Sequence, residues 1–201
     1  RRLSRGLGDV YKRQQQEDGA FATSYIPTNG AAATRGADTT VIDGEEFTEF
    51  FDHNGIDTND YQGTLISFVE LDSSTTPSAG RYNKIQLEMN NDNKISFAQM
   101  GGGTPYIHGI ISYGGSIQID GGSSGSTFPT VLKQGLAFAK NNAAFCYNGN
   151  TVHTDNSVNV GHPSFKYTQL TIGGSPSKAH LKKITYYNSR ISDTQLRNLT
   201  S

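Results

Sequence analysis

Two tight turns between strand-like runs constrain the fold of this chain more than any other feature of its sequence. Residues 131–140 and 143–149 are apolar runs separated by Asn141-Asn142, and Asn148-Gly149 then leads into residues 151–154. An Asn-Gly pair in this setting favours a hairpin, because both central residues of a type I′ turn need positive φ. Large side chains alternate with small or polar ones along the second run, as in a strand with one buried face. We therefore predict a β-meander.

Short strand-like segments continue through the rest of the chain. We expect strands at residues 64–71, 82–90, 94–100, 106–113 and 116–120. Gly- and Asn-rich turns separate them, and no amphipathic helix lies between them. This pattern predicts antiparallel sheets stacked face to face, so the expected fold class is an all-β, two-sheet antiparallel sandwich.

Only the C-terminal end has a clear helical pattern. Ser192 and Gln195 fit a capping box, in which the serine hydroxyl accepts from the glutamine amide and the glutamine side chain reaches back. We expect a short helix there, with Leu196 and Leu199 packed on the sandwich edge. Residues 43–51 fit either a helical turn or a loop before the first strand, and the sequence leaves both open.

Composition and charge exclude several classes of protein. The chain has 201 residues and a single Cys, so no disulfide framework can form within it. No apolar run approaches the ~20 residues that span a bilayer. Residues 1–14 contain five Arg or Lys and one Asp, a net charge of +4. The remaining 12 basic and 17 acidic residues give −5. A mildly acidic folded part argues against a nucleic-acid binder.

The N-terminal segments differ from the rest in composition. Residues 1–14 resemble translated adaptor sequence found at the ends of metagenomic gene predictions, and we expect a non-native leader there. Residues 15–38 are an extended segment stopped by Pro27, followed by a Gly/Ala/Thr linker.

One resemblance covers roughly Ala20 to Ser201. The stretch EDGAFATSYIPTNGAAATRGAD resembles the junction that, in tailed-phage tail and tail-fibre proteins, leads from a jelly-roll module into a concanavalin A-like (laminin-G-like) sandwich domain. Seven further segments, with Leu196, resemble that domain's strands and terminal helix in the same order: residues 63–68, 83–87, 93–97, 136–139, 145–149, 170–173 and 184–192. The resemblance implies that residues 15–38 are the end of a missing upstream module plus a linker, and that 39–201 form a concanavalin A-like sandwich domain of the jelly-roll type.

The sequence does not predict catalysis. The E-x-D-x-x-E pattern of glucanases with this fold is absent, and the cluster Glu45, Glu46 and Glu49 precedes the first expected strand. Residues 121–125 match the G-x-S-x-G motif of a nucleophile elbow in their sequence. A nucleophile elbow needs a helix after the serine, whereas a flexible loop is expected there. The five His lack metal-ligand spacing, and Cys146 is expected to be a packed residue.

Calcium is the one cofactor that the sequence leaves open. The loop of residues 52–60 carries Asp52, Asp57 and Asp60 around a glycine, and hard cations bind six to eight oxygens. The loop lacks the terminal Glu of an EF-hand, so it fits a plain polar loop as well as a weak calcium site.

Alternation along the strands selects candidate carbohydrate-binding residues. Tyr82, Tyr106 and His108 are predicted to face away from the apolar positions of their strands, and sugars are usually held by an exposed aromatic face with polar groups beside it. The chain has no Trp, which weakens a stacking platform.

These observations predict a non-catalytic domain of a phage tail or tail fibre that binds host-surface glycan. Expected partners are a cell-surface polysaccharide and other tail subunits, in a homo-oligomeric full-length protein located in the virion and facing the cell exterior; neither nucleic acid nor membrane insertion is expected. The first alternative is a structural spacer or assembly domain of the tail, and the second is a glycan-degrading enzyme.

Overall fold

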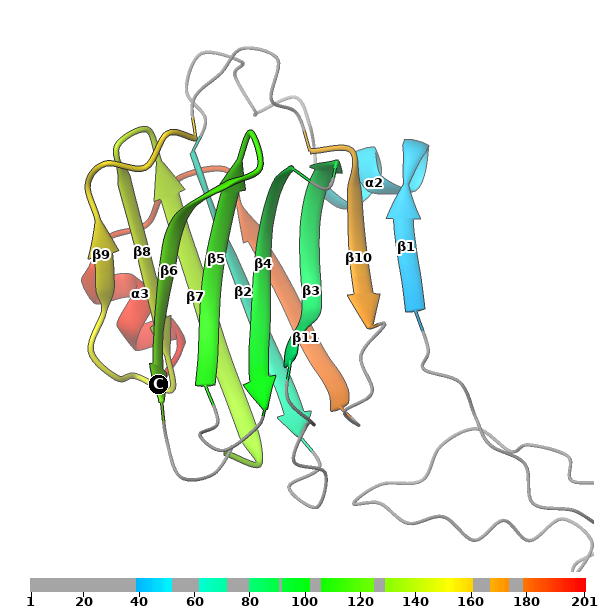
Figure 1. Ribbon diagram of the computed structural model, residues 1–201. Helices are drawn as coiled ribbons and strands as arrows, with labels where there is room; N and C mark the ends of the chain where they lie inside the picture. The colour runs from blue at the N-terminus through cyan, green and yellow to red at the C-terminus, as the bar shows by residue number, and fades with distance from the viewer. Residues whose placement is uncertain are drawn as a thin grey trace, which may run out of the picture.

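The chain folds into two antiparallel β-sheets stacked face to face (Figure 1). The structure, a computed structural model, describes residues 39–51, 62–71, 80–90, 92–101, 106–124, 129–160, 167–173 and 179–201. The predicted all-β sandwich is confirmed. The predicted leader and linker segments, residues 1–38, lie outside the described residues.

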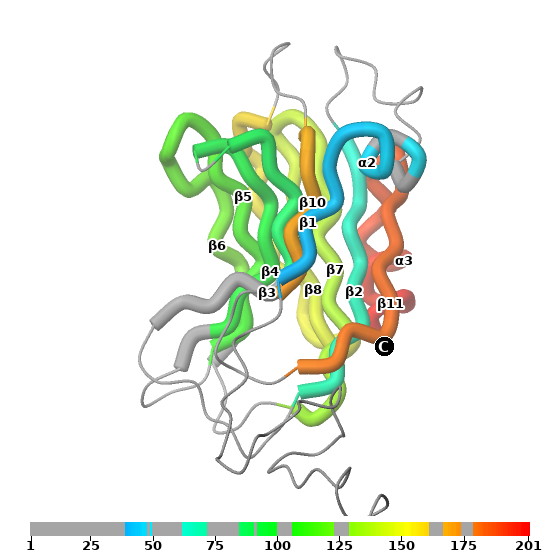
Figure 2. Tube along the Cα trace, turned by 90° about the vertical axis from the view of Figure 1, so that its right-hand side faces the viewer, coloured from blue at the N-terminus to red at the C-terminus, as the bar shows by residue number. Residues whose placement is uncertain are grey.

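The first sheet has six strands, which are, in spatial order, β1 (Thr39–Asp43), β10 (Gln169–Gly173), β3 (Gly80–Asn90), β4 (Asn93–Gly101), β5 (Tyr106–Tyr113) and β6 (Ser116–Ser124). The second has five, which are β11 (Ala179–Tyr187), β2 (Gly63–Leu71), β7 (Val131–Ala139), β8 (Asn142–Tyr147) and β9 (His153–Asp155). Helix α2 (Gly44–Phe51) follows β1, and helix α3 (Asp193–Leu199) follows β11. Figure 2 views the sandwich from its β1 side and separates the two layers.

The predicted β-meander is formed by β7, β8 and β9. Asn148 and Gly149 have φ values of 44° and 66°, and the Asn150 amide donates to the Tyr147 carbonyl at 2.9 Å. Positive φ at both central residues is the type I′ geometry expected from the Asn-Gly pair. The Asn148 side chain also accepts from the Lys133 amide at 2.8 Å and donates to the Val131 carbonyl at 3.0 Å, which ties the turn to β7.

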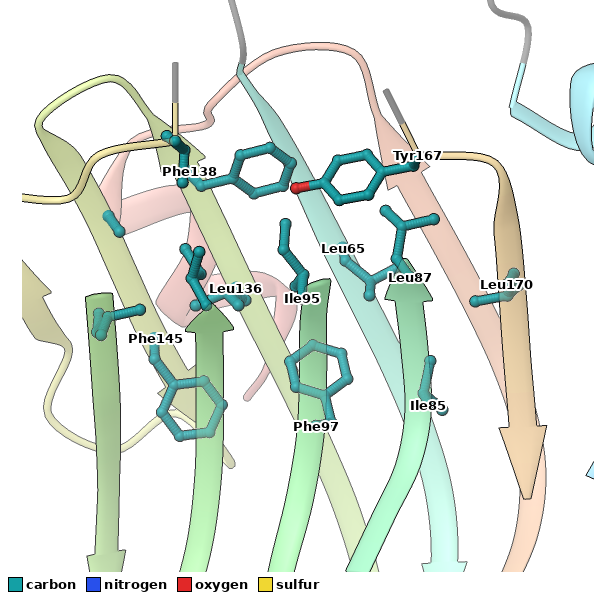
Figure 3. Close-up of a cluster of buried hydrophobic side chains, with 14 of the residues drawn as sticks. Leu65, Ile85, Leu87, Ile95, Phe97, Leu136, Phe138, Phe145, Tyr167 and Leu170 are labelled. Carbon is teal, nitrogen blue, oxygen red and sulfur yellow. The ribbon is translucent and has the colours of Figure 1, made fainter. Parts of the chain in front are cut away.

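The core fills the space between the sheets (Figure 3). Phe97 of β4 and Phe145 of β8 are fully buried, with ring centroids 6.3 Å apart across the two layers. Phe145 lies against Gly109 of β5, where an added Cβ would sit 2.1 Å from its ring. The absent side chain at Gly109 therefore makes room for the Phe145 ring between the sheets.

The two helices have different roles. Residues 44–51, left open by the sequence, form α2, and its Phe47 joins the core. Helix α3 begins at the predicted capping box of Ser192 and Gln195. It packs on the side of the five-stranded sheet that faces away from the core, through fully buried Leu196.

Two details differ from the sequence predictions. Leu199 is 40% exposed instead of packed, because Leu196 of α3 and Thr200, the C-cap that follows it, lie against Gly135. Strand β6 continues to Ser124, beyond the predicted strand end at residue 120 and into the G-x-S-x-G stretch. Among the described residues, no helix is long and apolar enough to cross a membrane.

Candidate binding face

The outer face of the six-stranded sheet, the side turned away from the core, carries rows of polar side chains. Ile107 and Ile111 of β5 point into the core, so Tyr106, His108, Ile110 and Ser112 lie on this outer face. The strand register joins residues of neighbouring strands into rows across the sheet. One row is Asp43, Gln169, Glu88, Lys94 and Ser112, and the next is Val41, Thr171, Gln86, Ser96, Ile110 and Asp120. Neither described helix covers this face (Figure 1).

At the β5–β6 end of the outer face, two rings and a carboxylate form one unit. The rings of Tyr106 and His108 have centroids 4.1 Å apart at an interplanar angle of 42°. His108 Nδ1 lies 2.5 Å from Asp120 Oδ1 on β6. The His108 side chain is only 7% exposed, whereas that of Asp120 is 38% exposed. The imidazole is thus fixed by the sheet, and the carboxylate faces the solvent beside it.

The tyrosine ring of this unit depends on a glycine. A Cβ on Gly122, the register partner of His108, would lie 2.6 Å from Tyr106 Cε1 and 2.2 Å from the Ile107 carbonyl oxygen. Tyr106 therefore leans over β6, and its half-buried ring offers an aromatic surface beside His108.

At the β3–β10 side of the outer face, Glu88 is the acceptor of a second unit. Its carboxylate accepts from Gln86 Nε2 at 2.5 Å, from Gln169 Nε2 at 2.6 Å and from Thr171 Oγ1 at 2.9 Å. Glu88 is 6% exposed, but its three donors are half-buried. Three neutral donors around one carboxylate hold it in place while their own edges stay accessible to a ligand.

Small residues lie between the two units. Ser96 and Ala98 of β4 are 1% and 0% exposed, although both belong to the outer face by their register with Ile110 and His108. The Ser96 hydroxyl has no hydrogen-bond partner within the described part of the chain. The centre of the face therefore carries small, buried side chains, with the rings of Tyr106 and His108 on one side and the Glu88 unit on the other.

The structure brings two of the three predicted carbohydrate-binding residues together. Tyr106 and His108 share the outer face and touch. Tyr82 pairs with Gln99, and the register between β3 and β4 shifts between Asn83 and Ile85, which interrupts the alternation used to select it. Its side chain is outside the described set, so its part in binding stays a prediction.

Asp120, Glu88 and their partners were missed as site residues. Asp120 of β6 stands opposite Ile110 of β5, so it contacts His108 diagonally, two residues along the neighbouring strand. Only the register of β5 and β6 reveals that His108 and Asp120 are in contact. The hydrogen bonds to Glu88 from Gln169 and Thr171 come from β10, a strand that is distant from β3 in sequence.

Two further sequence predictions concern a calcium site and the single cysteine. The weak calcium candidates Asp52, Asp57 and Asp60 lie outside the described residues, within which no three His, Cys, Asp or Glu side chains form a group that would hold a metal ion. Cys146 is buried beneath α3, where Thr200 Oγ1 donates to its sulfur at 3.3 Å, as expected of a packed residue.

Similarity to known proteins is found at the level of structure. The sequence matches no family model and no curated protein. The carbohydrate-binding CBM40 module of the Ruminococcus gnavus IT-sialidase, bound to α2,3-sialyllactose, is similar over 72% of this chain and 85% of that chain, with a TM-score of 0.54 and 12% identity. The heptameric SAP-like pentraxin of Limulus polyphemus is similar over 70% of each chain, with a TM-score of 0.51 and 14% identity.

The binding domain of Botulinum neurotoxin DC, in complex with rat synaptotagmin II, has a TM-score of 0.56 and 11% identity, over 81% of this chain and 39% of that chain. At such identities the similarity shows a shared jelly-roll sandwich architecture, which is consistent with the predicted concanavalin A-like fold.

Proposed function

We propose that this domain binds carbohydrate, without catalysis, on the outer face of its six-stranded sheet. The observation that carries the proposal is the pairing of an aromatic surface with fixed polar groups there: Tyr106 beside His108, His108 bonded to Asp120, and the Glu88 unit on the β3–β10 side of the same face. Sugars need both a face for their C–H groups and directed partners for their hydroxyls. The structural similarity to a sialyllactose-bound module supports the same class of ligand.

The spacing of the carboxylates supports binding over catalysis. Glu88 and Asp120 lie on strands β3 and β6, three inter-strand spacings or about 14 Å apart. Glycosidases place their two acids about 5–5.5 Å or 6.5–9.5 Å apart. Asp43 is closer to Glu88, but Gln169 lies between them in the row and donates to Glu88.

The distribution of exposed apolar side chains favours binding over a purely structural role. A spacer that docks on other subunits by a sheet face would expose a continuous apolar patch. In the described ranges the large exposed apolar residues are spread over six different elements: Val41, Met89, Ile117, Val131, Tyr187 and Leu199. We place the domain in a phage tail or tail fibre, facing the host surface, on the strength of the sequence resemblance.

The test is a glycan array probed with the full chain displayed multivalently on beads, because many weak contacts gain strength together. We expect selective binding that falls about tenfold in Tyr106→Ala, since an aromatic contact contributes roughly 0.5–1.5 kcal/mol beyond its buried area. Tyr187→Ala is the matched control, because Tyr187 is 36% exposed on the other sheet.

Failure of the multivalent protein to bind any glycan would exclude the proposed function. Equal losses of binding in Tyr106→Ala and Tyr187→Ala would exclude the outer face as the binding site. Tyr82→Ala tests the remaining predicted aromatic contact. Arrays run with and without calcium test the separate prediction for residues 52–60.

A further inference from the structure

We infer that Asn148 is a site of spontaneous modification: the unfolded chain loses the side-chain amide of this residue, and the folded chain blocks the loss. The inference is independent of the proposed function. An Asn that precedes Gly is prone to this reaction, because glycine has no side chain to shield its backbone nitrogen. The chain contains three such pairs, Asn29-Gly30, Asn54-Gly55 and Asn148-Gly149, of which the first two lie outside the described residues.

The reaction needs the backbone nitrogen of Gly149 to reach the side chain of Asn148. After this nitrogen loses its proton to water or hydroxide, it attacks Cγ of Asn148, so that a C–N bond forms and the bond between Cγ and Nδ2 breaks. Nδ2 takes a proton from water and leaves as ammonia. Water then opens the cyclic imide at one carbonyl or the other, and the product is aspartate or isoaspartate. Water is the only co-reactant.

In the folded chain the Asn148 side chain is turned towards β7 and held at both of its polar atoms. Oδ1 accepts from the Lys133 amide at 2.8 Å, and Nδ2 donates to the Val131 carbonyl at 3.0 Å. The Asn148 amide also donates to the Lys133 carbonyl at 2.8 Å, so backbone and side chain are bonded to the same strand. Because Cγ lies between Oδ1 and Nδ2, it can turn to the Gly149 nitrogen only after both side-chain bonds break.

The backbone on the other side of the reacting atoms is confined as well. Gly149 has φ of 66°, and the hydrogen bond from the Asn150 amide to the Tyr147 carbonyl closes the turn at 2.9 Å. A Cβ on Gly149 would lie 2.8 Å from Ser201 Oγ, so Ser201 packs directly on the turn. The Lys133 ammonium group donates to the Ser201 carbonyl and holds it there. Rotation of either reacting group therefore disturbs several contacts together.

Either product weakens the turn from which it forms. An aspartate at this position has no hydrogen to donate to the Val131 carbonyl, and its carboxylate faces that carbonyl oxygen instead. Isoaspartate adds a carbon atom to the main chain within a tight turn whose geometry requires positive φ at both central residues. A chain that reacts while unfolded therefore returns to a less stable domain, and Asn148 records the time that the chain has spent unfolded.

The test follows the loss of the Asn148 amide by peptide mass mapping of the full chain, kept folded in buffer or unfolded in urea at the same mildly alkaline pH. In urea we expect a rate close to those of the other two Asn-Gly pairs. In the folded chain we expect a rate at Asn148 at least about twentyfold lower, since each of the two bonds that must break favours the closed turn by roughly fivefold. Equal rates in the folded and unfolded chain, or no reaction in urea, overturn the inference.

Gly114→Asn is the matched control for the side-chain hydrogen bonds. It places the same dipeptide in a second turn with positive φ at both residues, 56° at Gly114 and 76° at Gly115. A Cβ on Gly114 would meet nothing within 4 Å, so the new side chain begins in open space. In the folded variant this amide should be lost at least about fivefold faster than that of Asn148, although the Gly115 amide donates to the Asp92 carbonyl at 3.0 Å. Equally slow loss at the two turns would mean that the turn conformation alone protects, and would overturn the role of the side-chain bonds.

Asn148→Asp reproduces one product and tests its effect on the fold. In urea titrations we expect the ratio of folded to unfolded chain to fall about fivefold or more, the effect of one lost hydrogen bond. Asn150→Asp is the control, because it adds the same charge at an exposed position of the same turn. An Asn148→Asp chain as stable as Asn150→Asp would overturn the conclusion that the reaction weakens the domain.

Discussion

Gly109 sets how closely β5 of one sheet and β8 of the other approach across the core. The ring of Phe145 from the opposite sheet occupies the space where any other residue would place its Cβ, 2.1 Å from Cδ2 and 2.6 Å from Cγ. Because interiors are close-packed, the ring has to move or the sheets have to separate when that space is filled.

We predict that Gly109→Ala lowers the free energy of unfolding by about 2 kcal/mol or more, the range typical of overpacked cores. Urea unfolding followed by tyrosine fluorescence measures it. In a double-mutant cycle, Phe145→Leu should relieve much of the loss in the Gly109→Ala background. Additive losses would mean that the two residues do not compete for this space.

Single residues also show where prediction from sequence stops. Alternation placed Tyr106 and His108 on the outer face correctly, because β5 is regular in that part. It gave no sign of the Asp120 contact, since a diagonal pair depends on which residues of two strands stand opposite each other. It was also insensitive to the shift in β3 after Asn83, because an extra residue reverses the alternation without changing the composition.

At the scale of elements, the Asn148-Gly149 turn combines two separate stabilising effects. Asn148 adopts φ of 44°, a backbone conformation that costs less free energy for asparagine than for most residues. Its side-chain oxygen and nitrogen both form hydrogen bonds with the backbone of β7.

Two substitutions at Asn148 separate these effects. Asn148→Gly keeps the backbone conformation and loses the side-chain hydrogen bonds, for an expected cost of about 1–2 kcal/mol. Asn148→Ala loses both, and we expect about 1 kcal/mol more, the penalty of a left-handed conformation for an L-residue. Urea midpoints at unchanged m-value measure the difference. Equal losses of stability in Asn148→Gly and Asn148→Ala would show that Asn148 stabilises the turn through its side-chain hydrogen bonds alone.

Elements whose ends carry turn or capping residues were predicted well. Such features depend on a few consecutive residues, so they can be predicted without tertiary information. The examples are the turns at Asn148-Gly149 and Gly114-Gly115 and the helix cap at Ser192. Helix α2 was left undecided, because its main support is the burial of Phe47 in the core. Leu199 was placed wrongly, because the i and i+4 residues Leu196 and Thr200 contact Gly135 instead.

At the scale of the whole molecule, buried tyrosines tie stability to alkaline pH. Burial raises the pKa of Tyr186, and burial together with the nearby Tyr186 raises the pKa of Tyr167. In the unfolded chain both ionise near pH 10. Above that pH the folded state therefore holds more protons than the unfolded state, so their contribution to stability, fully present below about pH 10, is lost as pH rises further.

We predict that the free energy of unfolding falls steeply above about pH 10, by about 1.4 kcal/mol per pH unit for each such tyrosine. Tyr186→Phe should remove one of these contributions and flatten the slope. Tyr187→Phe, at the next and more exposed position, should leave it unchanged. Urea unfolding between pH 8 and pH 11 gives the slopes, and identical slopes for Tyr186→Phe and the unsubstituted protein would contradict the prediction.

The sandwich itself was predictable because many short strands without helices between them have few other ways to bury their apolar faces. The order of the strands was not. Strand β10 lies between β1 and β3, and β2 lies between β7 and β11, so each sheet joins residues far apart in the sequence. Nothing local marks such partners, and the Glu88 unit, which depends on β10, was hidden for that reason.

The same strand order has a consequence for how the chain is made. Strand β1 has one sheet neighbour, β10, which begins at Gln169, about 130 residues later. At roughly 5–20 residues per second a ribosome needs on the order of ten seconds to supply it. During that interval an emerging chain presents β1 and β2 as unpaired strand edges, the surfaces from which aggregation starts. Synthesis speed and chaperone supply should therefore govern the yield of this domain more than its final stability does.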